Sequence, residues 1–279
     1  AHVIPVKTRY WMWTLDANIS FNRNKIGGLN ADQFSDVAWG IESMFLRRNG
    51  HPIGTLYGYV EDGFYDNEAE VRADPYYRDA TPSKVKSMVG QVKYKNLDDD
   101  PVIDDRDKTI IGDTNPDYQY GITSTLNWKK WTFSFFLQGT QGNDILNVNL
   151  KQFDVAVGSG NMPYFVFNNR WTPENRAAAK WPRADGTFTR AMKASDRYIV
   201  DGSYLRCKNI SLSYNWAHPV KFVESINIVA SITNLFTISG YEWYDPDLNA
   251  FGSDPTRRGV DMSSYPSART FNLGIQLAF

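Results

Sequence analysis

The sequence predicts an all-β fold, an antiparallel sheet of about seven strands that forms a segment of a transmembrane β-barrel with long extracellular loops. Three observations support this prediction. Apolar and polar residues alternate over segments of about 10–12 residues, which is the length that crosses a bilayer at a tilt. Aromatic residues cluster at the ends of these segments, where the interfacial girdles of a barrel lie. Short turns and very long connections separate the segments.

The composition excludes several other classes of protein. The 279 residues carry 30 Lys and Arg against 31 Asp and Glu, whereas nucleic-acid-binding proteins usually have a basic face. The mean hydropathy is −0.46 and no long apolar run occurs, so no helical membrane span is expected. The single cysteine excludes an intrachain disulfide framework. The first residues, 1–6, include neither an initiator Met nor a signal peptide, so we expect a mature product, a processed piece or a fragment.

The individual strands follow from the alternation. We expect them over residues 11–22, near 53–63, over 118–128 and 131–138, near 203–214, over 226–232 and over the last ten residues. In the segment 203–214, Leu205 and Cys207 are out of phase with Ile210 and Leu212, and a bulge near Asn209 would reconcile them.

The connections suggest which end of the sheet faces which compartment. The turn at Lys129-Lys130 is short, whereas the connections at roughly 64–117, 143–202 and 237–269 are long, as periplasmic turns and extracellular loops are in outer-membrane barrels. Counting back from a periplasmic C-terminus, we expect the chain to begin in an extracellular loop. The connection at roughly 23–52 does not fit, because it would be a long periplasmic one.

A soluble, aromatic-rich β-sandwich that binds carbohydrate also shows alternating strands, and it is the alternative to the barrel. If the barrel prediction holds, seven strands are too few, because the smallest bacterial barrels have eight. An open sheet edge is not tolerated in lipid, so the chain should be part of a larger barrel.

Short sequence segments, in order along nearly the whole chain, resemble a known family. Together they are similar to the C-terminal part of SusC/RagA-like TonB-dependent transporters of Bacteroidetes outer membranes. The segments are Asn18–Lys25, Pro52–Tyr59, Val92–Leu97, Thr109–Gly112, Phe135–Gly139, Gly142–Asp144, Ser203–Arg206, Lys208–Tyr214, Asn234–Thr237 and Tyr265–Phe271.

The resemblance implies a 22-stranded barrel filled by an N-terminal plug, located in the outer membrane. It implies uptake of an oligosaccharide or a peptide nutrient, a SusD-like surface lipoprotein that closes over the extracellular mouth, and a TonB complex that pulls on the plug. Residues 1–279 would be the C-terminal portion of the barrel, with the plug and about fifteen strands absent. We therefore expect the chain to pair with the N-terminal remainder of the same transporter and to contact outer-membrane lipid.

One acidic segment has the spacing of a calcium loop. Oxygen-bearing side chains fall at positions 1, 3, 5, 9 and 12 of twelve residues, as an EF-hand loop requires. Compared with the family pattern the segment is degenerate, because Pro101 replaces the glycine at position 6 and cannot adopt a positive φ. Calcium binding and a solvated acidic loop both remain possible. The ligands would be Asn96, Asp98, Asp100, Asp104 and Asp107.

Two long loops carry aromatic and charged residues that are candidates for contact with a ligand or with the lid. Aromatic faces stack on sugar rings, and Tyr, Trp and Arg are enriched at protein interfaces, but packing of one loop on another is a third interpretation. The residue pattern around 237–247 is typical of the family, which favours a structural role there. The candidates are Tyr164, Phe165, Trp171, Trp181 and Arg183 in one loop, and Tyr241, Trp243, Tyr244, Asp245 and Asp247 in the other.

The end of the chain resembles the signal that the barrel-assembly machinery reads, a final strand with an aromatic last residue that can pair with a receptor edge. An ordinary lipid-facing strand would look the same. The residues concerned are Phe271, Leu273, Ile275, Leu277 and Phe279.

No enzyme is predicted. The three histidines, His2, His51 and His218, lack metal-ligand spacing, and Cys207 has no neighbouring histidine motif. Neither a Gly-x-Ser-x-Gly motif nor a P-loop occurs.

Overall fold

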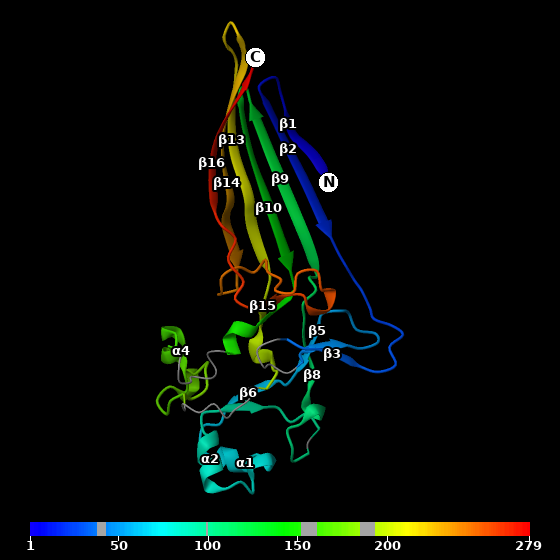
Figure 1. Ribbon diagram of the computed structural model, residues 1–279, viewed down its shortest axis with the longest axis vertical. Helices are drawn as coiled ribbons and strands as arrows, with labels where there is room; N and C mark the ends of the chain where they lie inside the picture. The colour runs from blue at the N-terminus through cyan, green and yellow to red at the C-terminus, as the bar shows by residue number, and fades with distance from the viewer. Residues whose placement is uncertain (38–42, 99, 152–160, 185–192) are drawn as a thin grey trace.

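The computed structural model describes residues 1–37, 43–98, 100–151, 161–184 and 193–279. A single antiparallel sheet of seven strands runs along the long axis of the molecule (Figure 1). Among these seven, each strand pairs with the next along the chain, so the sheet is a meander. In order, the strands are β1 (His2–Lys7), β2 (Trp11–Ser20), β9 (Tyr118–Trp128), β10 (Trp131–Gln141), β13 (Tyr204–Val220), β14 (Val223–Ser239) and β16 (Thr270–Ala278).

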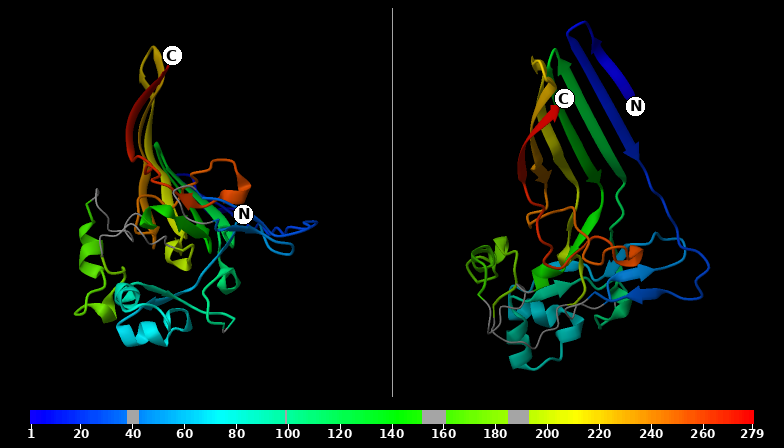
Figure 2. Two further views of the ribbon diagram at one scale, coloured as in Figure 1. Left: turned by 60° about the horizontal axis from the view of Figure 1, so that its bottom comes forward. Right: turned by 45° about the horizontal axis from the view of Figure 1, so that its top comes forward.

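The two ends of the sheet differ in their connections. At one end, which we call the turn end, residues 8–10, 129–130 and 221–222 close three tight hairpins. At the other, the loop end, the connections 21–117, 142–203 and 240–269 fold into a separate layer of small elements (Figures 1 and 2). The C-terminal strand finishes at the turn end, since Ala278 pairs with Ser225 next to the third hairpin.

Register aligns the apolar residues into rows across the sheet. Residues directly opposite each other on neighbouring strands share a face. We call the face that carries these rows the apolar face, and the other the polar face. One such row runs through six strands and consists of Trp13, Leu126, Phe133, Leu212, Ala230 and Leu273.

Aromatic rings mark both margins of the apolar face. At the turn end Trp11, Trp128, Trp131 and Tyr214 lie directly opposite one another, with ring centroids 5.4 Å apart in the first pair and 4.7 Å apart in the last. At the loop end Tyr120 lies eight positions before Trp128 on β9. That spacing corresponds to about 26 Å of extended strand, close to the height of the apolar band of a membrane barrel.

The apolar face is not a soluble core. Phe271 and Leu273 of β16 are 70% and 78% exposed. Among the described residues, no other sheet is hydrogen-bonded to the seven-stranded sheet. The fully buried apolar side chains lie in the loop layer. A sandwich would bury these rows between two sheets, so the structure does not support that alternative. None of the helices in the described residues has the length and apolar content of a membrane span.

Within the described residues, the loop layer contains three small sheets, three helices and several 3-10 turns. The sheets, in strand order, are β3 (Gln33–Ser35), β4 (Phe45–Arg47), β5 (Thr55–Gly58) and β8 (Thr109–Asp113); β12 (Ile199–Asp201), β11 (Asp144–Asn147) and β15 (Val260–Asp261); and β6 (Glu61–Phe64) with β7 (Val92–Tyr94). The helices are α1 (Glu68–Ala73), α2 (Pro82–Met88) and α4 (Tyr164–Asn169). The 3-10 turns are η1 (Pro75–Tyr77), η2 (Asp105–Asp107), η3 (Val148–Leu150), η4 (Arg176–Ala178), η5 (Asp196–Tyr198) and η6 (Pro255–Arg257).

Local sequence explains the two N-terminal helices, and long-range packing holds the layer together. The Asn67 side chain caps α1 by accepting from the Glu70 amide at 2.9 Å, and Pro82 opens α2. The main core joins all three loops, because Leu56, Leu146 and Val260 are fully buried in one cluster. This layer is therefore a folded unit with its own core.

The membership of the sheet differs from the prediction in one strand. The segment 53–63 is not a membrane strand, because β5 pairs with β4 and β8 in the loop layer and Leu56 is buried there. Alternation alone does not tell which sheet a strand joins. The seventh strand is β1, which pairs with β2, so the chain begins in the sheet and not in a loop.

This correction removes the misfit at residues 23–52. That segment is part of one long connection, 21–117, at the loop end, and every described connection at the turn end is short. The bulge predicted near Asn209 is confirmed, since the pairing of β13 with β14 shifts register between Cys207 and Asn209. Strands β13 and β14 are longer than predicted, at 17 residues each.

Candidate ligand-binding cleft at the loop end

A cavity of about 620 Å³ lies in the loop layer. All three long connections contribute to it: Glu61 comes from the first, Phe165, Trp181 and Arg197 from the second, and Trp243 from the third. Four of the ten predicted contact residues therefore line one cleft, namely Phe165, Trp181, Tyr241 and Trp243. A cavity of this size with aromatic walls and a few polar groups is typical of a ligand site.

A nearly buried ion pair fixes one wall of this cleft. Arg197 donates through Nη1 to both carboxylate oxygens of Glu61, at 2.7 and 3.0 Å. Its other terminal nitrogen donates to the Lys180 carbonyl at 2.8 Å. The guanidinium lies 5.2 Å from the ring centroid of Trp181, a cation–π distance. Arg197 thus orients the indole and joins the first connection to the second.

Aromatic rings form the remaining walls. Phe165 of α4 meets Trp181 edge-on, with ring centroids 6.1 Å apart. Trp243 contacts Tyr244 in the same manner at 5.6 Å. The Tyr241 hydroxyl bonds Asp261 Oδ2 at 2.5 Å, and burial together with that carboxylate raises the pKa of Tyr241. The Tyr241 ring is therefore a fixed wall, held from behind by its own hydroxyl.

Other predicted contact residues have structural surroundings. Trp171 is 4% exposed, and its indole nitrogen donates to Asp66 at 3.2 Å. Arg183 donates from its guanidinium to the Ser87 carbonyl at 3.1 Å. Gly90 lies against both, since a Cβ there would come within 2.5 Å of the Trp171 ring and 2.8 Å of Arg183.

The remaining four residues divide between the interior and the surface. Asp245 and Asp247 form ion pairs with Arg206 and Lys208 of β13. Tyr164 and Tyr244 are exposed to solvent, at 78% and 66%. The two exposed tyrosines are free to meet a partner, whereas the two carboxylates are engaged within the chain.

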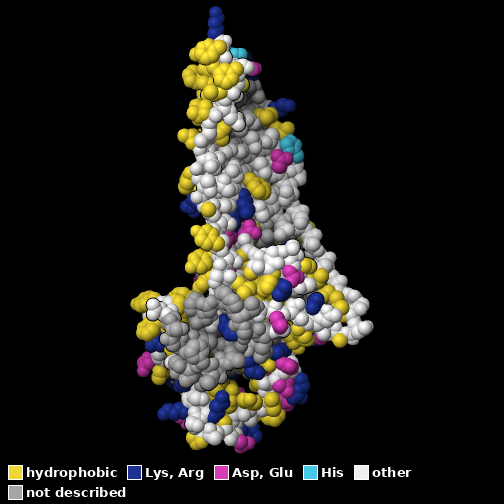
Figure 3. All heavy atoms as spheres, viewed as in Figure 1, with side chains coloured by type: hydrophobic (Ala, Val, Ile, Leu, Met, Phe, Trp, Pro, Cys, Tyr) yellow, Lys and Arg dark blue, Asp and Glu magenta, His cyan; other side chains and the backbone are white. Residues whose placement is uncertain are grey.

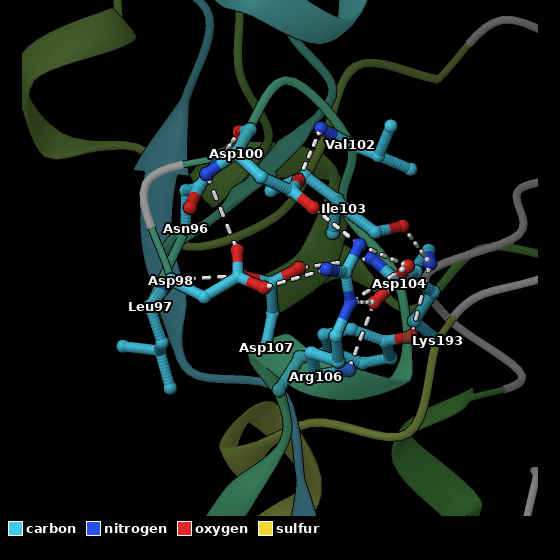
Figure 4. Close-up of polar contacts among 11 residues, drawn as sticks. Asn96, Leu97, Asp98, Asp100, Val102, Ile103, Asp104, Arg106, Asp107 and Lys193 are labelled. Atoms are coloured by element: carbon cyan, nitrogen blue, oxygen red, sulfur yellow. Dashed lines mark hydrogen bonds and ion pairs between the residues drawn. The ribbon is translucent and has the colours of Figure 1, made fainter.

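The acidic loop 96–107 brings three of its five predicted ligands together around a guanidinium. Arg106 donates to Asp104 at 3.0 and 3.2 Å, forms an ion pair with Asp98 at 3.4 Å and pairs closely with Asp100 (Figure 4). The Arg106 hydrogen bonds hold the pKa of Asp104 below its usual value.

The other two predicted ligands face the backbone. Asp107 is fully buried and accepts from the amides of Leu97 and Asp104 at 2.7 and 2.8 Å, and the Asn96 amide donates to the Asp100 carbonyl. In the part of the chain that the structure describes, no group of three His, Cys, Asp or Glu side chains is arranged to hold a metal ion. As arranged, the loop does not fit a calcium ion, because Arg106 supplies the positive charge.

Sequence reasoning missed Glu61 and Arg197. They lie 136 positions apart, and no spacing rule connects them. Only the fold of the loop layer reveals the pair.

Comparison with known proteins identifies the type of sheet and loop layer described above. No protein-family model matches the chain. Two TonB-dependent receptors of Formosa agariphila are 31% and 29% identical to it over 96% and 98% of its length. The TonB-dependent receptor SusC of Bacteroides thetaiotaomicron is 28% identical over 99%. The chain spans only 25–28% of the length of these relatives.

Solved structures agree with this match. The RagAB peptide transporter matches the whole chain with a TM-score of 0.75 at 17% identity, over 28% of the length of that protein. The RagAB peptide importer in its open-open state gives a TM-score of 0.69 at 17% identity, over 27%. The chain fits the C-terminal part of a SusC/RagA-like TonB-dependent receptor.

The match settles three predictions. The seven-stranded sheet is a segment of a receptor barrel, as the alternation predicted. The location is the outer membrane, where the apolar face of a barrel sheet meets lipid. The relatives are TonB-dependent receptors and not enzymes.

Proposed function

We propose that the chain is the C-terminal barrel portion of a TonB-dependent active transporter, which imports an oligosaccharide or a peptide across the outer membrane together with a SusD-like lipoprotein lid. The observation that carries this proposal is the combination of a sheet with an apolar face and a folded loop layer that holds a cleft at one end. SusC is a TonB-dependent receptor, which supports TonB-dependent uptake, and RagAB is a peptide importer, which supports the peptide class of substrate.

The sheet needs further strands to function in lipid. In the described residues β1 and β16 each pair on one side only. Unpaired backbone groups are costly in hydrocarbon, so the N-terminal remainder of the transporter would supply strands to both edges. That remainder would also carry the plug and the contact with TonB. The exposed final strand, with Phe279 at its end, would be read by the barrel-assembly machinery before the barrel closes.

The two kinds of loop residue suit two different roles. Phe165, Trp181 and Trp243 line an enclosed cleft and present rings to a ligand, which suits a sugar ring or an apolar peptide side chain. Tyr164 and Tyr244 project into solvent at the same end of the molecule and suit contact with the lid. The calcium loop is not part of this proposal.

The test uses the complete transporter with its lipoprotein. Trp181→Ala and Phe165→Ala should each weaken substrate binding at least about fivefold, the effect of losing an aromatic contact at a binding site. Tyr265→Ala, at a tyrosine that is 93% exposed and outside the cleft, is the matched control. Binding is measured by calorimetry against panels of oligosaccharides and peptides. Equal affinities for all three variants would remove the cleft from the transport path.

Tyr164→Ala separates the lid from the substrate. This change should reduce co-purification of the lipoprotein while leaving substrate affinity at its original value. If a lipoprotein never co-purifies with the intact transporter, the lid part of the proposal is wrong and the uptake part stands on the binding data alone.

A further inference from the structure

Four basic residues lie on the first two hairpins at the turn end: Lys7, Arg9, Lys129 and Lys130. The two turns are adjacent in space, because β2 pairs with β9 along its whole length and the Lys129 amide donates to the Tyr10 carbonyl at 3.0 Å. We call these four side chains with Tyr10 the turn patch. All five residues are exposed.

The turn patch has no counter-charge of its own. None of its four cations has a carboxylate partner in the described part of the chain. The strands β2, β9 and β10 contain a single carboxylate, Asp16, and it bonds His2 at 2.6 Å. Elsewhere in the molecule most clustered cations are paired, as Arg106 and Arg206 are.

Two of the cations share one aromatic ring. The Arg9 guanidinium lies 5.4 Å from the ring centroid of Tyr10, and Lys129 Nζ lies 5.6 Å from the same ring and 5.5 Å from that of Trp128. Like charges gathered on one ring repel each other, and the ring offsets only part of that repulsion. An anion between Arg9 and Lys129 would pair with both cations.

The backbone at Lys129 adds an independent indication. Its φ is +52°, a left-handed conformation that disfavours lysine and favours Gly or Asn. A lysine at such a position places a charge at the turn at the expense of local stability, and strain of this kind is typical of functional sites.

The depth of these cations in the membrane indicates which anion they bind. Lys129 directly follows Trp128, and Lys130 directly precedes Trp131. Both tryptophans belong to the aromatic row at the margin of the apolar face. Aromatic girdles lie at the level of the lipid headgroups, so the cations lie about one residue, roughly 3.3 Å, beyond it. Figure 3 shows basic and hydrophobic side chains together at this end of the molecule.

We propose that the turn patch binds the phosphate of an anionic phospholipid in the leaflet at the turn end, with the acyl chains lying along the apolar face beside Trp11 and Trp128. Lys7, Arg9, Lys129 and Lys130 supply the positive charge, and Tyr10 positions Arg9 and Lys129. The inference rests on the location of the chain in the outer membrane and not on its transport activity.

The test uses the complete receptor in mild detergent, with phosphatidylglycerol, phosphatidylcholine or inorganic phosphate added. Native mass spectrometry measures the bound lipid, and the melting temperature measures its effect on stability. The receptor should retain phosphatidylglycerol and melt at a higher temperature with it than with phosphatidylcholine. The variant R9Q/K129Q/K130Q should bind phosphatidylglycerol at least about tenfold more weakly. Lys86→Gln, an exposed lysine of α2 in the loop layer, is the control and should bind as the native receptor does.

Lys129→Asn gives a result that a merely structural role would not produce. It should raise the melting temperature without lipid, because Asn tolerates the positive φ, and it should weaken binding of phosphatidylglycerol at the same time. The proposal is wrong if the triple variant binds phosphatidylglycerol as tightly as the native receptor. It is also wrong if inorganic phosphate alone gives the full thermal shift, since the patch would then be an unspecific anion site.

Discussion

Arg206 of strand β13 and Asp245 of the last long connection form a buried ion pair, with side chains 2% and 6% exposed. Arg206 also donates to the Thr237 hydroxyl of β14 at 2.9 Å and to the Ser267 hydroxyl at 3.2 Å. Asp245 accepts in turn from the backbone amides of Ser267 and Asp247. The pair therefore fastens both ends of the connection 240–269 to the barrel wall.

Breaking this pair should release that connection. Asp245→Asn removes the close carboxylate partner of the buried Arg206 and leaves only the more distant Asp247, at 3.6 Å. Breaking a buried ion pair in this way costs up to about 3–5 kcal/mol. Tryptic cleavage at Arg257 and Arg258, within the connection, should become faster in the detergent-purified receptor. Lys208→Gln removes only a half-exposed contact with Asp247 and should cost less than about 1 kcal/mol. Equal cleavage rates in the two variants would mean that other contacts hold the connection.

The same pair gives a pH dependence of known sign. Burial alone would raise the pKa of Asp245, but the hydrogen bonds from Arg206, Ser267 and Asp247 outweigh it and the pKa lies below the usual value. Because the folded carboxyl is the stronger acid, its stabilising contribution is complete above the ordinary carboxyl pKa of about 3.9 and is lost as the pH falls through the lower folded value. The melting temperature of the native receptor relative to Asp245→Asn should therefore be constant from pH 8 to about pH 5 and should fall only in stronger acid. A fall already at neutral pH would contradict this.

A charge placed on one face of the last strand should destabilise the barrel far more than a charge placed on the other face. Leu273→Arg places a cation on the lipid-facing side near the middle of β16 and should destabilise the barrel by about 2–4 kcal/mol. Asn272→Arg lies on the polar face of the same strand and should have little effect, because the interior of such barrels is polar. Heat-modifiable migration of the complete receptor on denaturing gels measures both. Similar losses in the two variants would argue against a lipid-facing row.

The acidic loop should be insensitive to calcium as long as Arg106 is present. Chelators should leave its resistance to proteolysis unchanged, because the arginine already neutralises Asp98, Asp100 and Asp104. Arg106→Gln removes that charge, so the carboxylates should repel each other and the loop should open to proteases. Lys86→Gln is the matched control for removing one exposed cation. Protection of the native loop that disappears on chelation would restore the calcium interpretation.

Much of the sheet was predictable from sequence because membrane strands obey a simple rule. Lipid on one side and polar surroundings on the other impose period-2 alternation, which located β9 and β16 almost to the residue and β10 to within three residues at its end. The strand β1 escaped because it is short and contains Pro5. The β5 segment was misassigned because buried strands of the loop layer alternate too.

The candidate cleft was predictable only in part. Aromatic residues in long loops drew attention to Phe165, Trp181 and Trp243, but composition did not separate them from Trp171, which is a buried structural residue. The spacing of the acidic loop drew attention to its carboxylates, but it gave no sign that Arg106 lies among three of them. Long-range partners such as Glu61 and Arg197 leave no local signal in a single sequence.

The central claim is that the seven-stranded sheet faces lipid with one side and the barrel interior with the other. Spin labels at single cysteines along residues 271–275, in the complete receptor with Cys207→Ala and reconstituted in a bilayer, test it most directly. The account predicts that labels at Phe271, Leu273 and Ile275 are reached by oxygen dissolved in the lipid, whereas labels at Asn272 and Gly274 are not. Equal accessibility at all five positions, or oxygen access at 272 and 274 instead, would contradict it.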